Sequence, residues 1–176
     1  MLPLNFGGNI LEELYREESA ASGDRKIISG LALLIIAAMF VYEIMNLMEK
    51  GHFNLLGWGM NFCLLGLWIW RNCYHYTLIL YRGRLAVITH GPAVNRRYEV
   101  DLTRTESFTN RYVRSFFRKT KISHYVHRYN SLDGNTQRLL VFTEGKKNKL
   151  AGLLFKASDD FVKQLRRQMP DKYLEL

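Results

Sequence analysis

Two long apolar stretches lie close together near the start of the chain, at residues 27–48 and 53–70. A helix over residues 27–48 would be roughly 33 Å long, enough to cross a hydrocarbon core of about 30 Å. The second stretch is shorter, but Trp68 and Trp70 would lie at the membrane interface, with Arg71 just beyond them. Only Glu49 to His52 separate the two, which is the length of a tight turn. The sequence therefore predicts an antiparallel pair of transmembrane helices.

Charge is distributed unevenly along the chain and predicts its orientation. Residues 75–176 carry 20 Lys/Arg and 9 Asp/Glu, whereas residues 1–74 carry 5 and 7. By the positive-inside rule the basic part lies in the cytoplasm, and two spans place the N-terminus there too. Residues 1–26 contain no apolar core, so a cleaved signal peptide is not expected. We predict a multi-pass protein of the cell (inner or plasma) membrane, divided into residues 1–26, 27–74 and 75–176.

Small and polar residues in the two apolar stretches predict how the helices pack. Gly59, Cys63 and Gly66 recur at i, i+4 and i+7 and form a stripe that would let another helix approach closely. Asn61 lies near the middle of its span, where an interhelical hydrogen bond is the usual solution for an amide. Glu43 is close to a helix end, so we expect it to snorkel or to contact a protein partner rather than to form an ion path.

After Tyr74 the pattern changes from helical to strand-like. Residues 76–81 and 85–90 flank Arg82-Gly83, a two-residue turn, and predict a β-hairpin. Further strands are predicted at 96–102, 121–129, 137–143 and 149–155. Ser158 is the expected N-cap of a last helix, which Pro170 ends.

Two further helices are predicted from apolar and charged spacing. In residues 9–19, Ile10 and Leu14 are spaced i, i+4, and glutamates occupy the positions that would lie on the opposite face of a helix. This pattern indicates a short amphipathic helix in the N-terminal segment. If residues 108–118 are helical, Arg111, Arg114 and Arg118 share one face.

The order of these elements resembles a known family. Two membrane helices, the hairpin of Tyr76–His90, the segment Tyr98–Phe108, the basic Arg111–Lys119 region and one closing helix are similar to bacterial pleckstrin-homology-like (PH-like) membrane proteins. The resemblance covers about residues 27–169. It implies a membrane α-hairpin plus an α+β domain, in which a small antiparallel PH-like β-barrel or sandwich is capped by the C-terminal helix. It also implies docking of partners or lipids rather than chemistry, although the acidic N-terminal segment departs from the pattern.

The candidate binding site is a group of basic side chains that would suit phosphate. Arginine makes paired, charge-assisted hydrogen bonds to phosphate, and anionic lipid headgroups are the natural ligands near a membrane. The alternative is an ordinary solvated basic face. The candidate residues for lipid or partner binding are Arg111, Arg114, Arg118, Lys119 and Lys121, extended by Arg96 and Arg97.

No pattern in the chain predicts catalysis. A nucleophile paired with a base, a phosphate-cradling glycine loop and a metal-ligand spacing are all missing from the sequence, so we expect no enzyme, cofactor or metal. No nucleic-acid-binding motif accompanies the basic charge, so nucleic acid is not the expected partner.

Two functions agree with these features. The first is a non-enzymatic scaffold, or an accessory or assembly subunit, of a membrane protein complex; a homo-oligomer would also be compatible. The alternative is a membrane-anchored binder of anionic lipid headgroups through the Arg111–Lys121 patch.

Overall fold

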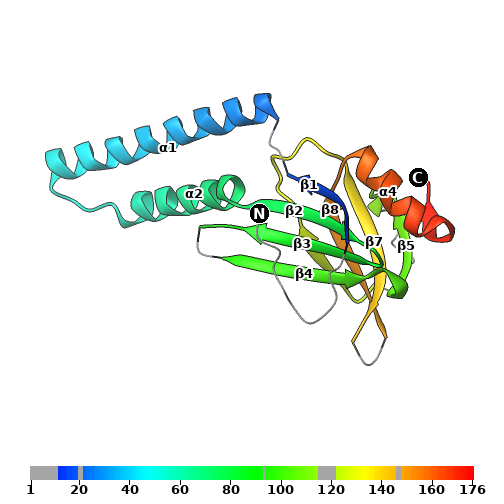
Figure 1. The fold of residues 1–176 in the computed structure, drawn as a ribbon. Coiled ribbons are helices and arrows are strands. Elements are labelled where there is room, and N and C mark those ends of the chain that lie inside the picture. The colour runs from blue at the N-terminus through cyan, green and yellow to red at the C-terminus, as the bar shows by residue number, and fades with distance from the viewer. Residues whose placement is uncertain (1–11, 20–21, 93, 115–121, 146–147) are drawn as a thin grey trace.

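The computed structural model describes residues 12–19, 22–92, 94–114, 122–145 and 148–176. Two long helices project together from one end of two β-sheets, and a third helix, α4, lies against the sheets (Figure 1). The helices are α1 (Gly23–Lys50), α2 (Leu55–Cys73) and α4 (Asp159–Gln168), and the 3₁₀ turns are η1 (Leu102–Arg104) and η2 (Pro170–Lys172).

Helices α1 and α2 and the turn between them form what we call the helical hairpin. Gly51 ends α1 in the left-handed conformation, with φ of 64°, and its amide donates to the Leu47 carbonyl. Asn54 then caps α2 by accepting a hydrogen bond from the Gly57 amide at 3.2 Å. Both helices therefore form where the apolar stretches predict helices.

The first sheet contains four antiparallel strands in the order β1-β2-β3-β4. The hairpin predicted on either side of Arg82-Gly83 is confirmed, and Gly83 makes the turn with φ of 78°. The strands are β1 (Glu13–Glu18), β2 (His75–Tyr81), β3 (Arg84–His90) and β4 (Asn95–Asp101).

The second sheet is mixed and has the order β6-β8-β7-β5-β9. Strands β5, β7 and β8 pair antiparallel, whereas β6 runs parallel to β8 and β9 parallel to β5. The strands are β5 (Thr105–Thr109), β6 (His124–Arg128), β7 (Gln137–Glu144), β8 (Lys149–Lys156) and β9 (Tyr173–Leu174).

Both sheets and α4 share one hydrophobic core. Leu80 and Leu85 of the first sheet, Leu140 and Leu153 of the second and Phe161 of α4 are completely buried in it. The architecture is α+β, as expected. The described strands form two open sheets rather than a closed barrel, because the four outermost strands, β1, β4, β6 and β9, each pair on one side only.

The predicted N-terminal helix is wrong over its described residues 12–19. Residues 13–18 instead form strand β1, whose backbone pairs with β2. Tyr15 and Glu17 are two positions apart, so they lie on the same face of the strand, where they contact Phe161 and Ser158. In the basic region no helix begins at Phe108, which lies in β5 and is 1% exposed, whereas Arg114 is helical and the segment after it lies outside the described residues.

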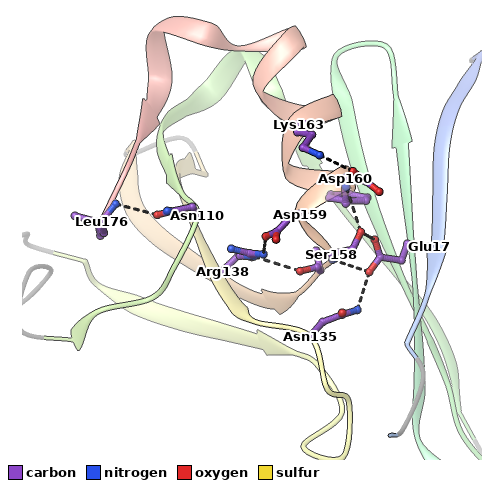
Figure 2. Close-up of polar contacts among 11 residues, drawn as sticks. Glu17, Asn110, Asn135, Arg138, Ser158, Asp159, Asp160, Lys163 and Leu176 are labelled. Atoms are coloured by element: carbon purple, nitrogen blue, oxygen red, sulfur yellow. Dashed lines mark hydrogen bonds and ion pairs between the residues drawn. The ribbon is translucent and has the colours of Figure 1, made fainter.

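Hydrogen bonds from Ser158 and Asn135 to Glu17, which we call the Glu17 clasp, connect β1 to the start of α4 (Figure 2). They explain why the acidic segment joins the sheet. The Glu17 carboxylate accepts hydrogen bonds from the Ser158 amide at 2.8 Å, the Ser158 hydroxyl at 2.6 Å and the Asn135 side chain at 2.9 Å. Ser158 is the N-cap of α4, as predicted, and its Oγ accepts from the Phe161 amide at 3.2 Å. A carboxylate at this helix end is also stabilised by the helix dipole.

We expect Glu17→Ala to lower stability by about 1–3 kcal/mol, because it leaves the Ser158 amide without its acceptor at the start of α4. Glu18→Ala is the matched control, since Glu18 is exposed and its ion pair among the described residues is with the exposed Arg16 on the same strand. Thermal melts followed by circular dichroism in mild detergent compare the two. Equal melting temperatures would contradict the role given to Glu17.

Candidate functional site

The helical hairpin buries polar side chains and exposes apolar ones, which is the reverse of a domain in water. The buried residues of α1 are Ser29, Ile36 and Glu43, spaced seven apart, and the single buried residue of α2 is Asn61. Large apolar side chains face outward, such as Met48 at 81% exposure and Leu55 at 76%. A continuous exposed apolar surface of this kind marks contact with a membrane or with another protein.

Among the described helices, α1 is the one that is both long and apolar enough to cross a membrane. Helix α2 has 19 residues, but Asn61, Arg71 and several glycines reduce its apolar character. Its outer surface is nevertheless apolar, with Leu56 76% and Trp70 63% exposed.

Polar contacts join the two helices at both ends of the hairpin. At the turn, the Asn54 side chain donates to Glu43 Oε1 at 3.1 Å, and the second carboxylate oxygen is buried with no hydrogen-bond partner in the described part of the chain. At the end next to the sheets, Trp68 Nε1 donates to the Ser29 carbonyl at 2.9 Å, and the Ser29 hydroxyl bonds to Asn72. Glu43 therefore lies inside the hairpin beside the start of α2.

The residues predicted to mediate helix packing fall on two different faces. Asn61 is 1% exposed and faces the interior, where its amide has no hydrogen-bond partner among the described residues. Gly59, Cys63 and Gly66 are exposed, and a Cβ added to either glycine would meet open space. The small-residue stripe therefore faces away from α1 and is available to another helix.

The hairpin is fixed to the sheets through residues 130–135, which we call the joint loop (Figure 1). Arg25 of α1 donates to the Ser131 and Asp133 carbonyls at 3.1 and 2.6 Å. Arg71 of α2 donates to the Ser131 hydroxyl at 3.1 Å, and Asn130 donates to the Tyr74 carbonyl at 2.8 Å. Both helices thus bind the same short loop.

The sheet side of the joint loop is held by further hydrogen bonds. Lys156, at the end of β8, donates to the Ser131 and Asp133 carbonyls at 3.3 and 2.5 Å. The loop also stabilises itself, since Asn130 accepts from the Leu132 amide and Asp133 from the Asn135 amide. The side chain of Asn135 extends the network to Glu17 of β1.

The buried carboxyl group of Asp133 sets the electrostatics of the joint loop. Burial raises the pKa of Asp133, while the Asn135 amide, Lys156 and Arg25 oppose that rise. Burial also lowers the pKa of Lys156, and the neighbouring charge of Arg25 lowers it further, while Asp133 opposes this fall. The cations therefore repel one another beside a carboxyl group whose ionised form is disfavoured.

The predicted basic patch is only partly described. Arg111 and Arg114 are exposed, whereas Arg118, Lys119 and Lys121 lie outside the described residues. Tyr112, between the two arginines, donates its amide to the Gln137 carbonyl at 2.8 Å. Because Gln137 begins β7 directly after the joint loop, Arg111 and Arg114 lie at the end of the second sheet from which the hairpin projects.

Arg96 and Arg97 lie on the outer strand of the first sheet. Their partners in β3 are Thr89 and Ile88, close to the start of β2 and so to the end of α2. Arg97 binds Glu99 at 2.6 Å and stacks over the Tyr81 ring at 5.5 Å, while Arg96 is exposed. The structure therefore places Arg96 near the same end of the sheets as Arg111.

Sequence reasoning missed the joint loop as a site. Ser131 to Asn135 have the composition of a turn, and nothing in the sequence connects them with Arg25 or Arg71. The signal was the dense run Asn130-Ser131-Leu132-Asp133-Gly134-Asn135, whose short side chains bind backbone groups. Its contact with helices about 60 and 106 residues away follows from the fold alone.

The described residues contain no group of three or more His, Cys, Asp or Glu side chains that could hold a metal ion. Comparisons with protein-family models, curated proteins and solved structures found no significant match. The joint loop and the two faces of the hairpin are therefore interpreted from their geometry.

Two glycines in α2 give a matched test of the hairpin interior. A Cβ on Gly57 would overlap Glu43 Oε1 and the Asn54 side chain, whereas a Cβ on Gly59 would meet nothing. We expect Gly57→Ala to be less stable than Gly59→Ala by about 1–3 kcal/mol, because alanine favours the helix at both positions but overpacks the interior only at Gly57. Thermal unfolding followed by tryptophan fluorescence measures the difference, since all three tryptophans lie in α2. Equal effects would contradict the position of Glu43.

Proposed function

We propose that this protein is a non-enzymatic membrane scaffold, or an accessory subunit of a membrane complex, whose two-sheet domain docks partner proteins. The observation that carries the proposal is the joint loop, which binds α1, α2, β8 and β1 at once. A domain on a loose tether needs no such connection. A domain that must present partners in a fixed position relative to a membrane does.

The hairpin is proposed to span the membrane with both helices. The support for α2 is its exposed apolar surface, which water would not stabilise. Arg25, Lys26 and Arg71 lie where the two helices meet the joint loop, so the positive-inside rule favours a cytoplasmic domain and cytoplasmic termini.

Two features support docking of protein partners. The outward stripe of Gly59, Cys63 and Gly66 leaves space for a close helix. Helix α4 packs on both sheets, as the closing helix of the proposed PH-like domain would, although the sheets are open and the second contains two parallel pairs. A protein that used the hairpin only as an anchor would have no need of this stripe.

Purification from the native membrane in mild detergent tests the scaffold function. We expect a partner at fixed stoichiometry, identified by mass spectrometry, and we expect Gly59→Ile to remove it by filling the stripe. Met60→Ile is the control, because Met60 is exposed on a neighbouring part of α2. A wild-type protein that purifies alone would argue against the scaffold.

A second candidate function is recognition of anionic lipid by the Arg111–Lys121 region. It is favoured by the position of Arg111 and Arg114 at the end of the second sheet nearest the hairpin. There they would face an anionic leaflet if the hairpin spans it, with attraction of about 1 kcal/mol per charge.

Lipid retention tests this second function. The full-length protein is reconstituted with phosphatidylcholine and phosphatidylglycerol, extracted, and its bound lipid quantified by mass spectrometry. We expect the combined Arg111→Ser, Arg114→Ser and Arg118→Ser variant to retain less phosphatidylglycerol. The control, Arg82→Ser, Arg84→Ser and Arg104→Ser, removes the same charge at the opposite ends of the strands. Equal retention by both variants would exclude the patch.

A further inference from the structure

Three cations from three different elements converge on one serine of the joint loop. Arg25 Nη1 lies 3.1 Å and Lys156 Nζ 3.3 Å from the Ser131 carbonyl oxygen. Arg71 Nε lies 3.1 Å from the hydroxyl oxygen of the same residue. These side chains are therefore held close together although their charges repel.

Their positive charge exceeds the negative charge that the described residues place beside them, since Asp133 is the one carboxyl group that acts on Lys156 and Arg25 there. Within the described part of the chain, Arg25, Arg71 and Lys156 form no ion pair, and their acceptors are neutral oxygens. Asp133 is 1% exposed; Arg25 and Lys156 favour its ionised form, whereas burial disfavours it, so it offsets only part of the charge of the three cations. A site with excess positive charge and ordered donors is suited to an anion.

The free donors of this cluster remain accessible. Arg25 and Arg71 are exposed and each binds the loop through one nitrogen, which leaves the rest of each guanidinium group available. Asp24 lies in the first turn of α1 and opposes the positive end of that helix dipole, so the site depends on the three cationic side chains themselves.

The position of the cluster indicates which anion it binds. Arg25 lies in the first turn of α1 and Arg71 in the last turn of α2, beside the exposed Trp70. Aromatic and basic residues at the ends of spans lie at the level of lipid headgroups. A phosphate group at this level belongs to a phospholipid rather than to a soluble metabolite.

We propose that Arg25, Arg71 and Lys156 bind the phosphate group of an anionic phospholipid at the base of the helical hairpin. The inference rests on the membrane insertion proposed above, and the site is separate from the Arg111–Lys121 patch. The bound headgroup relieves the repulsion among the three cations and so strengthens the joint between the hairpin and the sheets.

The test uses the full-length protein in mild detergent, with phosphatidylglycerol, phosphatidylcholine or inorganic phosphate added separately. Wild-type protein is expected to retain phosphatidylglycerol in preference to phosphatidylcholine and to melt at a higher temperature with it. Arg71→Gln and, separately, Lys156→Gln keep a hydrogen-bond donor without the charge. Each is expected to lower phosphatidylglycerol retention about fivefold. Arg84→Gln, whose side chain pairs with Glu99 on the first sheet, is the control and is expected to retain lipid like the wild type.

Each contrary outcome has a defined meaning. Equal phosphatidylglycerol retention by wild type and by both charge-removing variants, with unchanged circular dichroism spectra, overturns the lipid site. Stabilisation by inorganic phosphate equal to that by phosphatidylglycerol overturns the choice of a lipid and leaves a soluble phosphate. Membrane insertion is measured independently by carbonate extraction. Release of the wild-type protein by carbonate overturns the membrane proposal as well, whereas retention combined with equal lipid binding overturns the lipid site alone.

Discussion

The hydrogen bonds of the joint loop hold together parts of the chain that have little other connection. Arg25, Arg71 and Lys156 donate to its neutral oxygens from three directions, and Asn135 links it to Glu17 of β1. Hydrogen bonds from charged donors are typically worth about 1.5–3 kcal/mol each, which is enough to order a short loop. Without these hydrogen bonds, the hairpin and the sheets would be joined mainly by the two covalent connections of the chain, one before α1 and one after α2. The joint loop therefore determines whether the hairpin and the sheets keep a fixed relative orientation.

The helical hairpin and the two-sheet domain bury opposite kinds of side chain. The domain buries apolar side chains such as Leu80 and Phe161 in a shared core, as a domain in water does. The hairpin instead buries Ser29, Glu43 and Asn61 and exposes apolar side chains, which an apolar surrounding would favour. The joint loop lies at the boundary between the hairpin and the domain, where Arg25 and Arg71 stay exposed while they bind oxygens of the loop. This boundary is where a scaffold would fix the orientation of its docking domain.

Local patterns predicted much of the fold, and long-range pairing accounts for what they missed. The helices of the hairpin, the turn at Gly83 and the Ser158 cap follow from neighbouring residues, and each is present. Residues 13–18 could equally be arranged as a helix, and pairing with β2 together with the Glu17 clasp decides in favour of a strand. Of the candidate site, Asn61 and Glu43 were recognised as special residues of the hairpin. Arg25 and Lys156 could not be paired in advance, because they lie 131 positions apart and meet only through Ser131.

Distance measurement between the hairpin and the sheets tests the central claim most directly. Spin labels at Met48→Cys in α1 and Lys149→Cys in β8, with Cys63 and Cys73 replaced by serine, occupy exposed positions in the two parts. Pulsed electron paramagnetic resonance of the full-length protein in lipid nanodiscs gives the distribution of distances between them. The joint loop predicts one narrow distribution that broadens when Arg25 and Asn130 are changed to alanine. A broad distribution with the joint loop intact would contradict a fixed connection between the hairpin and the domain.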